Sequence, residues 1–308
     1  MNYPLKRILF FLFCIFFTAL HICAQDIDLF KMQDEQNKKD DKEKTDIVTA
    51  TFKTTRLING QSIENVGRGI MDVKISHRFG TLNSGAYNFF GLDQGTMRIG
   101  VDYGITDRLM VGIGRSSFNK EFDGFAKYKL LRQSTGKRNV PVSISYAVTG
   151  IWQSLKDPAT TYPIHYTDHF FFAHQLIIAR KFNDYFSLQL VPTLVHYNIV
   201  PLASSPNDYY SLGIGFRQRI SKRVNITGEY YYQFNKITGY YNSLSLGFDI
   251  ETGGHVFQLQ FTNSPGINEK TFITQTDGQW QGGNIHFGFN IARVFTIVKP
   301  KVLANTKW

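Results

Sequence analysis

The sequence predicts an all-β protein, a closed antiparallel transmembrane β-barrel of about twelve strands. Three observations predict it. An export signal begins the chain, the body alternates apolar and polar residues with the period of a strand, and tight turns at one end oppose mostly longer loops at the other. The chain has 308 residues, of which 43% are hydrophobic and 19% charged, and this composition excludes a disordered protein.

The N-terminus has the features of a secretory signal peptide, expected over residues 1–24. A basic pair precedes an apolar run from residue 8 to residue 19, and Ala24 supplies the small residue before a cleavage site. The run is shorter than the ~20 apolar residues of a membrane-spanning helix, which disfavours a membrane anchor. Lipid attachment at Cys23 is also disfavoured, because the bulky Ile22 precedes that cysteine.

A polar tail is expected to follow the signal over residues 25–47. This stretch holds few apolar residues, so it has no face to bury and predicts a solvated tail in the periplasm. Its charges are of both signs, which disfavours an arm that binds nucleic acid.

Residues 48–69 differ from the tail, because apolar residues return and charge falls. The apolar residues are Val48, Ala50, Phe52, Leu57 and Ile58. Such groups rarely stay in water, so we expect this segment to dock at the periplasmic mouth of the barrel. Lys53 and Arg56 are expected to face lumenal carboxylates such as Asp72 or Asp249. The sequence leaves open whether the segment is a plug or a loosely docked linker.

The barrel itself is expected over residues 70–298, followed by a C-terminal extension at 299–308. In its first strand Val73 and Ile75 point one way, and Lys74 points the other. The expected strands are 70–80, 95–106, 109–118, 121–132, 140–152, 168–182, 185–198, 207–220, 223–235, 240–252, 254–263 and 283–296. These lengths suit tilted membrane strands and exceed the ~5–6 residues of strands in soluble proteins.

The connections favour a membrane barrel over a soluble sandwich with an aromatic core. Tight links such as 183–184 and 221–222 alternate with longer ones such as 81–94, 153–167 and 264–282. Tyrosine and phenylalanine cluster near strand ends, as in an interfacial girdle. An even number of strands puts both termini at the tight-turn end. We therefore expect a protein of the outer membrane with both termini in the periplasm.

Several long motifs carry a resemblance to a known family. They are TFKTTRLINGQSIENVGRG (51–69), KISHRFGTLNSG (74–85), FFGLDQG (89–95), YGITDRLMVGIGRSS (103–117), FDGFAKYKLLRQS (122–134), FQLQFTNS (257–264) and IHFGFNIARVF (285–295). The chain resembles an uncharacterised Bacteroidetes family of outer-membrane β-barrel proteins, a domain of unknown function. The resemblance implies the barrel fold, and it supplies no substrate, cofactor or catalytic residue.

The sequence offers little sign of enzymatic chemistry. Both cysteines lie in the first 25 residues, and the chain has no zinc-protease, phosphate-loop or nucleophile-elbow motif. His165, Asp168 and His169 are the best metal candidates. However, two histidines at i,i+4 spacing face the same ion reliably only on a helix, and no helix is expected there. His174 lies in mid-strand and has no serine partner in its own segment. We therefore expect no catalytic residue, no metal and no cofactor.

The inward face of the barrel is the candidate functional surface. Alternation places the following residues toward the lumen: Lys74, Arg78, Arg98, Asp102, Lys127, Lys129, Arg217, Arg219, Glu229, Asp249 and His286. Charged rings of this kind select solutes in open barrels, whereas in small barrels opposed charges pair and brace the wall. The sequence leaves a polar pathway and a closed core equally open.

Two classes of function remain. The first is passage or binding of a small solute through the polar lumen. The second is a scaffold or surface-interaction barrel that acts through the loops at 81–94, 153–167 and 264–282, and an enzymatic barrel is a distant third. The expected partners are outer-membrane lipid, including lipopolysaccharide, and the barrel-assembly machinery during insertion. No nucleic acid is expected, and no specific protein partner can be named.

Overall fold

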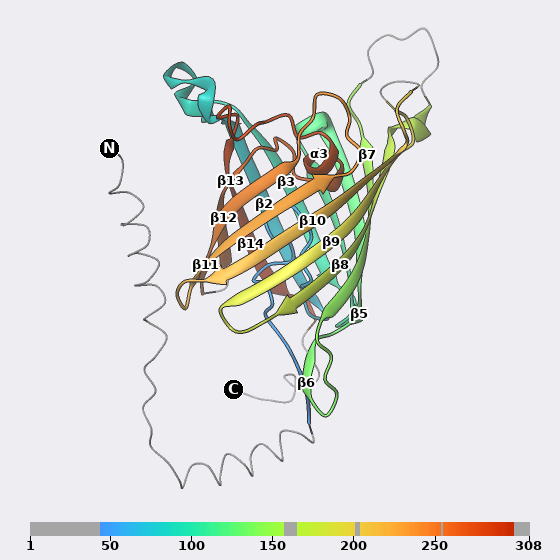
Figure 1. The fold of residues 1–308 in the computed structure, drawn as a ribbon, viewed down its shortest axis with the longest axis vertical. Coiled ribbons are helices and arrows are strands. Elements are labelled where there is room, and N and C mark those ends of the chain that lie inside the picture. The colour runs from blue at the N-terminus through green and yellow to red at the C-terminus, as the bar shows by residue number, and fades with distance from the viewer. Residues whose placement is uncertain (1–43, 157–164, 201–203, 254, 299–308) are drawn as a thin grey trace, which may run out of the picture.

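Twelve strands close into a single antiparallel barrel (Figure 1), which confirms the predicted fold class. The computed structural model describes residues 44–156, 165–200, 204–253 and 255–298. The barrel strands are β2 (Ile70–Thr81), β3 (Gly95–Gly104), β4 (Leu109–Ser116), β5 (Glu121–Leu131), β7 (Ser143–Gln153), β8 (Phe170–Lys181), β9 (Phe186–Tyr197), β10 (Asp208–Arg219), β11 (Val224–Gln233), β12 (Ser243–Thr252), β13 (His255–Thr262) and β14 (His286–Thr296).

The twelve strands form a closed ring of backbone hydrogen bonds, and no other described segment is needed to complete it. Each strand pairs with its sequence neighbour in the barrel, and β14 closes the ring against β2, where Ile291 lies opposite Ile75. Closure removes every free strand edge, as a membrane requires. Apolar side chains such as Ile99 and Ile113 are exposed on the outer wall, while Lys74 and its inward neighbours are buried.

A small sheet lies outside the barrel at the short-turn end. There β1 (Thr45–Ile47) pairs with β6 (Ser134–Gly136), in the connection between β5 and β7 (Figure 1). The expected polar tail over 25–47 is thus exposed at its last residues, but it forms a short strand there that the sequence analysis did not predict. All three residues of β1 expose their side chains, so mainly backbone pairing orders them, and no apolar pattern in the sequence predicts the strand. The expected signal peptide, the rest of the tail and residues 299–308 lie outside the described residues.

Helical structure is short and confined to connections. The elements are η1 (Leu82–Ser84), η2 (Ala86–Gly91), η3 (Phe118–Lys120), η4 (Tyr166–His169) and α3 (Glu269–Thr274). In the described ranges, none of these helices has the length and apolar character to cross a membrane. The expectation of no helix near His165 is wrong, because the Asp168 side chain accepts the backbone N–H of His165 at 2.8 Å and caps η4.

Two segments enter the barrel from opposite ends (Figure 1). Residues 51–66, here called the inner hairpin, rise from the short-turn end, and residues 263–276, here called the inner loop, descend from the long-loop end with α3. Nearly every residue of both segments is buried. The prediction of a surface loop over 264–282 is therefore wrong for its first half, which packs inside the barrel.

Candidate functional site in the filled lumen

The inner hairpin is a tight turn that bonds mainly to itself along its backbone. Arg56 and Gln61 form an antiparallel bridge, and the N–H of Leu57 donates to the Gly60 carbonyl at 2.8 Å. No backbone–backbone hydrogen bond joins the hairpin to a barrel strand within the described ranges. Side chains of the wall therefore hold it in place.

Glu229 on β11 holds the tip of the hairpin. Its carboxylate accepts the backbone N–H groups of Ile58 at 3.3 Å, Asn59 at 2.8 Å and Gly60 at 3.1 Å. A Cβ at Gly60 would lie 2.0 Å from the Tyr231 hydroxyl, so glycine is needed for this close approach. The tip is thus fixed by three charge-assisted hydrogen bonds in a buried setting.

Two lysines hold the base of the hairpin. The Lys127 ammonium on β5 donates to the Ser62 carbonyl at 2.8 Å and to the Thr55 carbonyl at 3.2 Å. Lys74 on β2 donates to the Thr55 hydroxyl, and Thr55 donates in turn to Asp102 at 2.8 Å. The wall therefore presents two cations to polar groups of the hairpin, and the charge of Lys74 is balanced by Asp72 and Asp102 of the wall.

A line of amides and one arginine completes the polar wall. Arg78 donates to the Asn59 side chain at 2.8 Å and to Asn290 at 3.0 Å. Gln258 donates to the Leu57 carbonyl at 2.6 Å and to Asp249 at 2.8 Å. These contacts come from β2, β13 and β14, so the polar grip on the hairpin extends across the closing seam of the barrel.

The hairpin and the inner loop meet at an ion pair. Arg56 lies 3.1 Å from Glu269 at the start of α3, and both side chains are buried. Lys270 ties the same helix to the wall through Glu121 at 2.8 Å. Burial lowers the pKa of the Lys270 ammonium, and the Glu121 carboxylate opposes that shift. The two inner segments thus contact each other as well as the barrel.

This junction is incompletely satisfied. Among the described residues, the Nε and Nη2 atoms of Arg56 and the Oε2 atom of Glu269 find no hydrogen-bond partner. A buried charged group that keeps open donors or acceptors is costly. The junction is therefore a weak point in the packing of the lumen.

One side of the lumen is apolar, a feature that the list of polar inward residues did not include. Inward residues of β8 and β9, among them Phe171 and Val195, pack with Leu57 of the hairpin and Phe272 of α3. Sequence reasoning missed this wall because β8 is apolar at many positions of both faces, so its alternation does not show which face is inward. The lumen therefore has a charged half and an apolar half.

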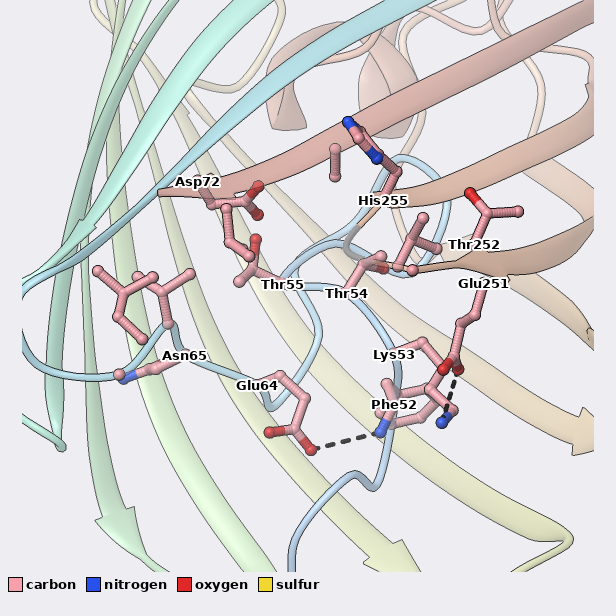
Figure 2. Close-up of a pocket in the computed structure, with 17 residues that line it drawn as sticks. Phe52, Lys53, Thr54, Thr55, Glu64, Asn65, Asp72, Glu251, Thr252 and His255 are labelled. Atoms are coloured by element: carbon pink, nitrogen blue, oxygen red, sulfur yellow. Dashed lines mark hydrogen bonds and ion pairs between the residues drawn. The ribbon is translucent and has the colours of Figure 1, made fainter. Parts of the chain in front are cut away.

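A pocket of about 570 Å³ lies at the short-turn mouth, beside the hairpin (Figure 2). Lys53 pairs there with Glu251 at 2.6 Å, and Glu64 accepts the backbone N–H of Phe52 at 3.3 Å. Lys129 lies 3.7 Å from Glu64. The volume is within the range of small-molecule sites.

The expected partners of Lys53 and Arg56 are wrong. They pair with Glu251 and Glu269, whereas Asp72 lies 2.8 Å from Lys74 within the wall. Asp249 accepts a hydrogen bond from Gln258 instead. Asp72 and Asp249 already have partners within the wall, so Lys53 pairs with another carboxylate of β12 and Arg56 pairs with the inner loop.

The remaining sequence candidates do not contact the hairpin. Arg98 forms a two-point pair with Asp123 at 2.8 and 2.5 Å, which braces β3 against β5. Arg217 donates to Ser187 at 3.4 Å, Arg219 to the Ser221 carbonyl at 3.1 Å, and His286 bonds to the Phe79 carbonyl at 2.7 Å.

Sequence reasoning missed six charged residues of the site: Glu121, Asp123, Glu269, Lys270, and Glu64 and Glu251 at the mouth pocket. The alternation along 121–132 could have placed Glu121 and Asp123 in the lumen, because both lie on the same inward face as Lys127. No periodic signal existed for the two that lie in the inner loop.

No metal-binding group emerges from the fold. Within the described ranges, no cluster of three or more His, Cys, Asp or Glu side chains has a geometry that holds an ion. His174 lies on the outer wall, where its ring nitrogen bonds to the Tyr146 hydroxyl at 2.7 Å.

The family described as "Membrane bound beta barrel domain (DUF5777)" matches residues 52–295, a span that includes the inner hairpin. No curated protein matches the chain. Among solved structures, the NanC porin aligns at a TM-score of 0.47 with 8% identity, over 74% of this chain and 100% of that one. The KdgM porin aligns at 0.45 with 11% identity, over 73% and 99%. The translocator domain of the autotransporter NalP from Neisseria meningitidis aligns at 0.34 with 13% identity, over 76% and 90%.

Proposed function

Because the chain belongs to this family of membrane-bound β-barrels, we propose that it binds and passes a small solute, with its lumen closed at rest by the inner hairpin and the inner loop together. Under this proposal the barrel lies in the outer membrane of a Bacteroidetes cell and both termini face the periplasm. It acts without catalysis. Outer-membrane lipid, including lipopolysaccharide, surrounds it, and the barrel-assembly machinery inserts it.

One observation carries the proposal: the hairpin is inside the barrel but is not part of its ladder. The ring closes between β14 and β2, and side chains alone hold residues 51–66 against the wall. The hairpin can therefore leave through the short-turn mouth without opening a strand edge to lipid. The unsatisfied groups at the Arg56–Glu269 junction lower the cost of that movement.

The two halves of the lumen indicate the kind of solute. Withdrawal of the hairpin uncovers charged side chains such as Lys127 and Glu229 on one side, and apolar ones such as Val191 and Val195 on the other. A pathway of this kind fits an amphipathic small molecule, with a polar end for the charged half and an apolar body for the other. The mouth pocket beside Lys53 provides an entry site on the same path.

Conductance of the purified protein in planar bilayers tests the proposal. The full chain is expected to be mostly closed. Deletion of residues 26–66 also removes the Arg56 partner of Glu269 in the inner loop, so it is expected to release both obstructions and give a folded barrel with steady current. A tethered variant provides the matched control. Asn59 donates to the Ser245 hydroxyl at 3.0 Å, so Asn59→Cys with Ser245→Cys, joined by a short thiol crosslinker, is expected to abolish openings until the link is cut. A folded but silent deletion variant would refute solute passage.

A second candidate function is a closed scaffold that acts through surface loops. It is favoured by the apolar packing of the hairpin and by η2, which projects from the long-loop end (Figure 1) with Tyr87, Phe89 and Phe90 exposed. Phe89 and Phe90 also have left-handed backbone angles, which strain residues other than glycine. Silence of the deletion variant in bilayers would favour this candidate.

A further inference from the structure

The outer wall of the barrel carries a groove of about 730 Å³ that the function of the lumen does not use. It crosses five adjacent strands, β3, β4, β5, β7 and β8, along rows of cross-strand neighbours. Ile113 on β4 lies opposite Gly124 on β5, Gly124 opposite Gly150 on β7, and Gly150 opposite Phe172 on β8. Two adjacent glycines therefore form the floor, and Ile113 remains 69% exposed beside them.

Nothing in the part of the chain that the structure describes requires glycine at these two positions. A Cβ at Gly124 or Gly150 would have no neighbour closer than 3.8 Å, and neither residue has a left-handed backbone. The inward glycines nearby are different, because a Cβ at Gly112 would lie 2.4 Å from Phe125. Glycine in a strand interior weakens the strand and often marks the close approach of a ligand. The open floor therefore indicates an occupant from outside the chain.

The rim of the groove toward the long-loop end is aromatic and basic. Arg115 lies opposite Phe122, Phe122 opposite Trp152, and Trp152 opposite Phe170. The Arg115 guanidinium is exposed and lies 5.4 Å from the centre of the Phe122 ring, and the Phe122 and Trp152 rings stack at 5.6 Å. Aromatic rings of this kind mark the interface between hydrocarbon and headgroups. An exposed arginine at that level presents two parallel N–H donors to an anionic group.

We propose that this groove is a binding site for one anionic membrane lipid, with an acyl chain on the floor of Gly124 and Gly150 and the headgroup phosphate on Arg115. The wall faces hydrocarbon in a membrane barrel, which makes a lipid chain the occupant that fits an apolar groove there. Arg115 is the one cation among the described residues that line the groove. It favours a headgroup with a net negative charge over a zwitterionic headgroup, whose own cation offsets its phosphate. The site does not depend on whether the lumen opens.

Native mass spectrometry of the full-length protein, released from detergent, tests the site with two lipids of equal chain length. The probes are dioleoyl phosphatidylglycerol, which is anionic, and dioleoyl phosphatidylcholine, which is zwitterionic. The protein is expected to retain one phosphatidylglycerol with about tenfold preference, the size of one partly desolvated arginine–phosphate contact. Arg115→Gln is expected to remove that preference.

Arg180 provides the matched control. It is an exposed outward arginine at the short-turn end of β8, 5.0 Å from the Phe182 ring, and Arg180→Gln should leave lipid retention unchanged. Gly124→Val and Gly150→Val fill the groove and are expected to lose retention of both lipids while the barrel stays folded. Gly124→Ala is the milder variant if valine disturbs folding, and it should weaken retention without abolishing it.

Two results would overturn the proposal. The first is equal retention of the two lipids by the unaltered protein, because this would mean that lipid adheres to the barrel nonspecifically. The second is a loss of retention in Arg180→Gln as large as that in Arg115→Gln, which would mean that any outward arginine suffices.

Discussion

Replacement of Glu229 by alanine is the sharpest test of how the inner hairpin is held. The carboxylate accepts three backbone N–H groups at the hairpin tip, from Ile58, Asn59 and Gly60. A buried donor left without its partner costs ~1–3 kcal/mol, so three of them cost about 3 kcal/mol at the low end of that range. We take the low end because the substitution also removes a buried charge and the cost of its desolvation. A loss of about 3 kcal/mol raises the undocked fraction of the hairpin by more than a hundredfold.

Hydrogen–deuterium exchange of the folded protein measures that fraction directly. The amides of residues 58–60 are expected to exchange about a hundredfold faster in Glu229→Ala, because they exchange from the undocked state. Strand amides of the barrel should keep their protection. Glu251→Ala is the control: its pair with Lys53 is partly exposed at the mouth, and such pairs contribute ~0–1 kcal/mol. Unchanged exchange at 58–60 in a folded Glu229→Ala protein, or an equal effect of Glu251→Ala, would refute the reasoning.

Three further predictions concern the stability of the barrel, measured as the temperature or urea concentration at which gel migration changes from the folded to the unfolded form. Arg98→Met leaves Asp123 buried without its cation and should cost ~3–5 kcal/mol, and a change below 1 kcal/mol would contradict this. Lys270→Met should cost a similar amount by leaving Glu121 unpaired, and the double variant with Glu121→Gln should recover part of the lost stability. Strictly additive losses of stability in the double variant would show that the two side chains do not interact. Gly104→Ala places a Cβ 2.1 Å from a backbone oxygen of the segment before β2 and should cost ~1–3 kcal/mol, whereas a neutral result would mean that this segment yields easily.

The strand pattern was predictable because the two solvents of a membrane barrel impose it. Lipid outside and polar groups inside force a period of two, so alternation located the twelve barrel strands to within a few residues and put Lys127 and Glu229 on the inward face. Where both faces are apolar the rule fails, as it does for the inner wall of β8. The short β1, with all its side chains exposed, gives no periodic signal at all.

The sequence by itself determined the barrel, the number of its strands and which side chains of most strands point inward. It also marked residues 48–69 as a segment that needs burial. Only the tertiary structure decided what fills the lumen and which charges meet there. Glu229 lies 170 positions from Asn59 along the chain, and Glu269 lies 213 positions from Arg56. Such pairs form only when the barrel closes around the inner segments, because the two side chains are too far apart in sequence for any local pattern to relate them. The inner segments also lack β-periodicity, so the sequence does not show which wall residue each of their side chains faces.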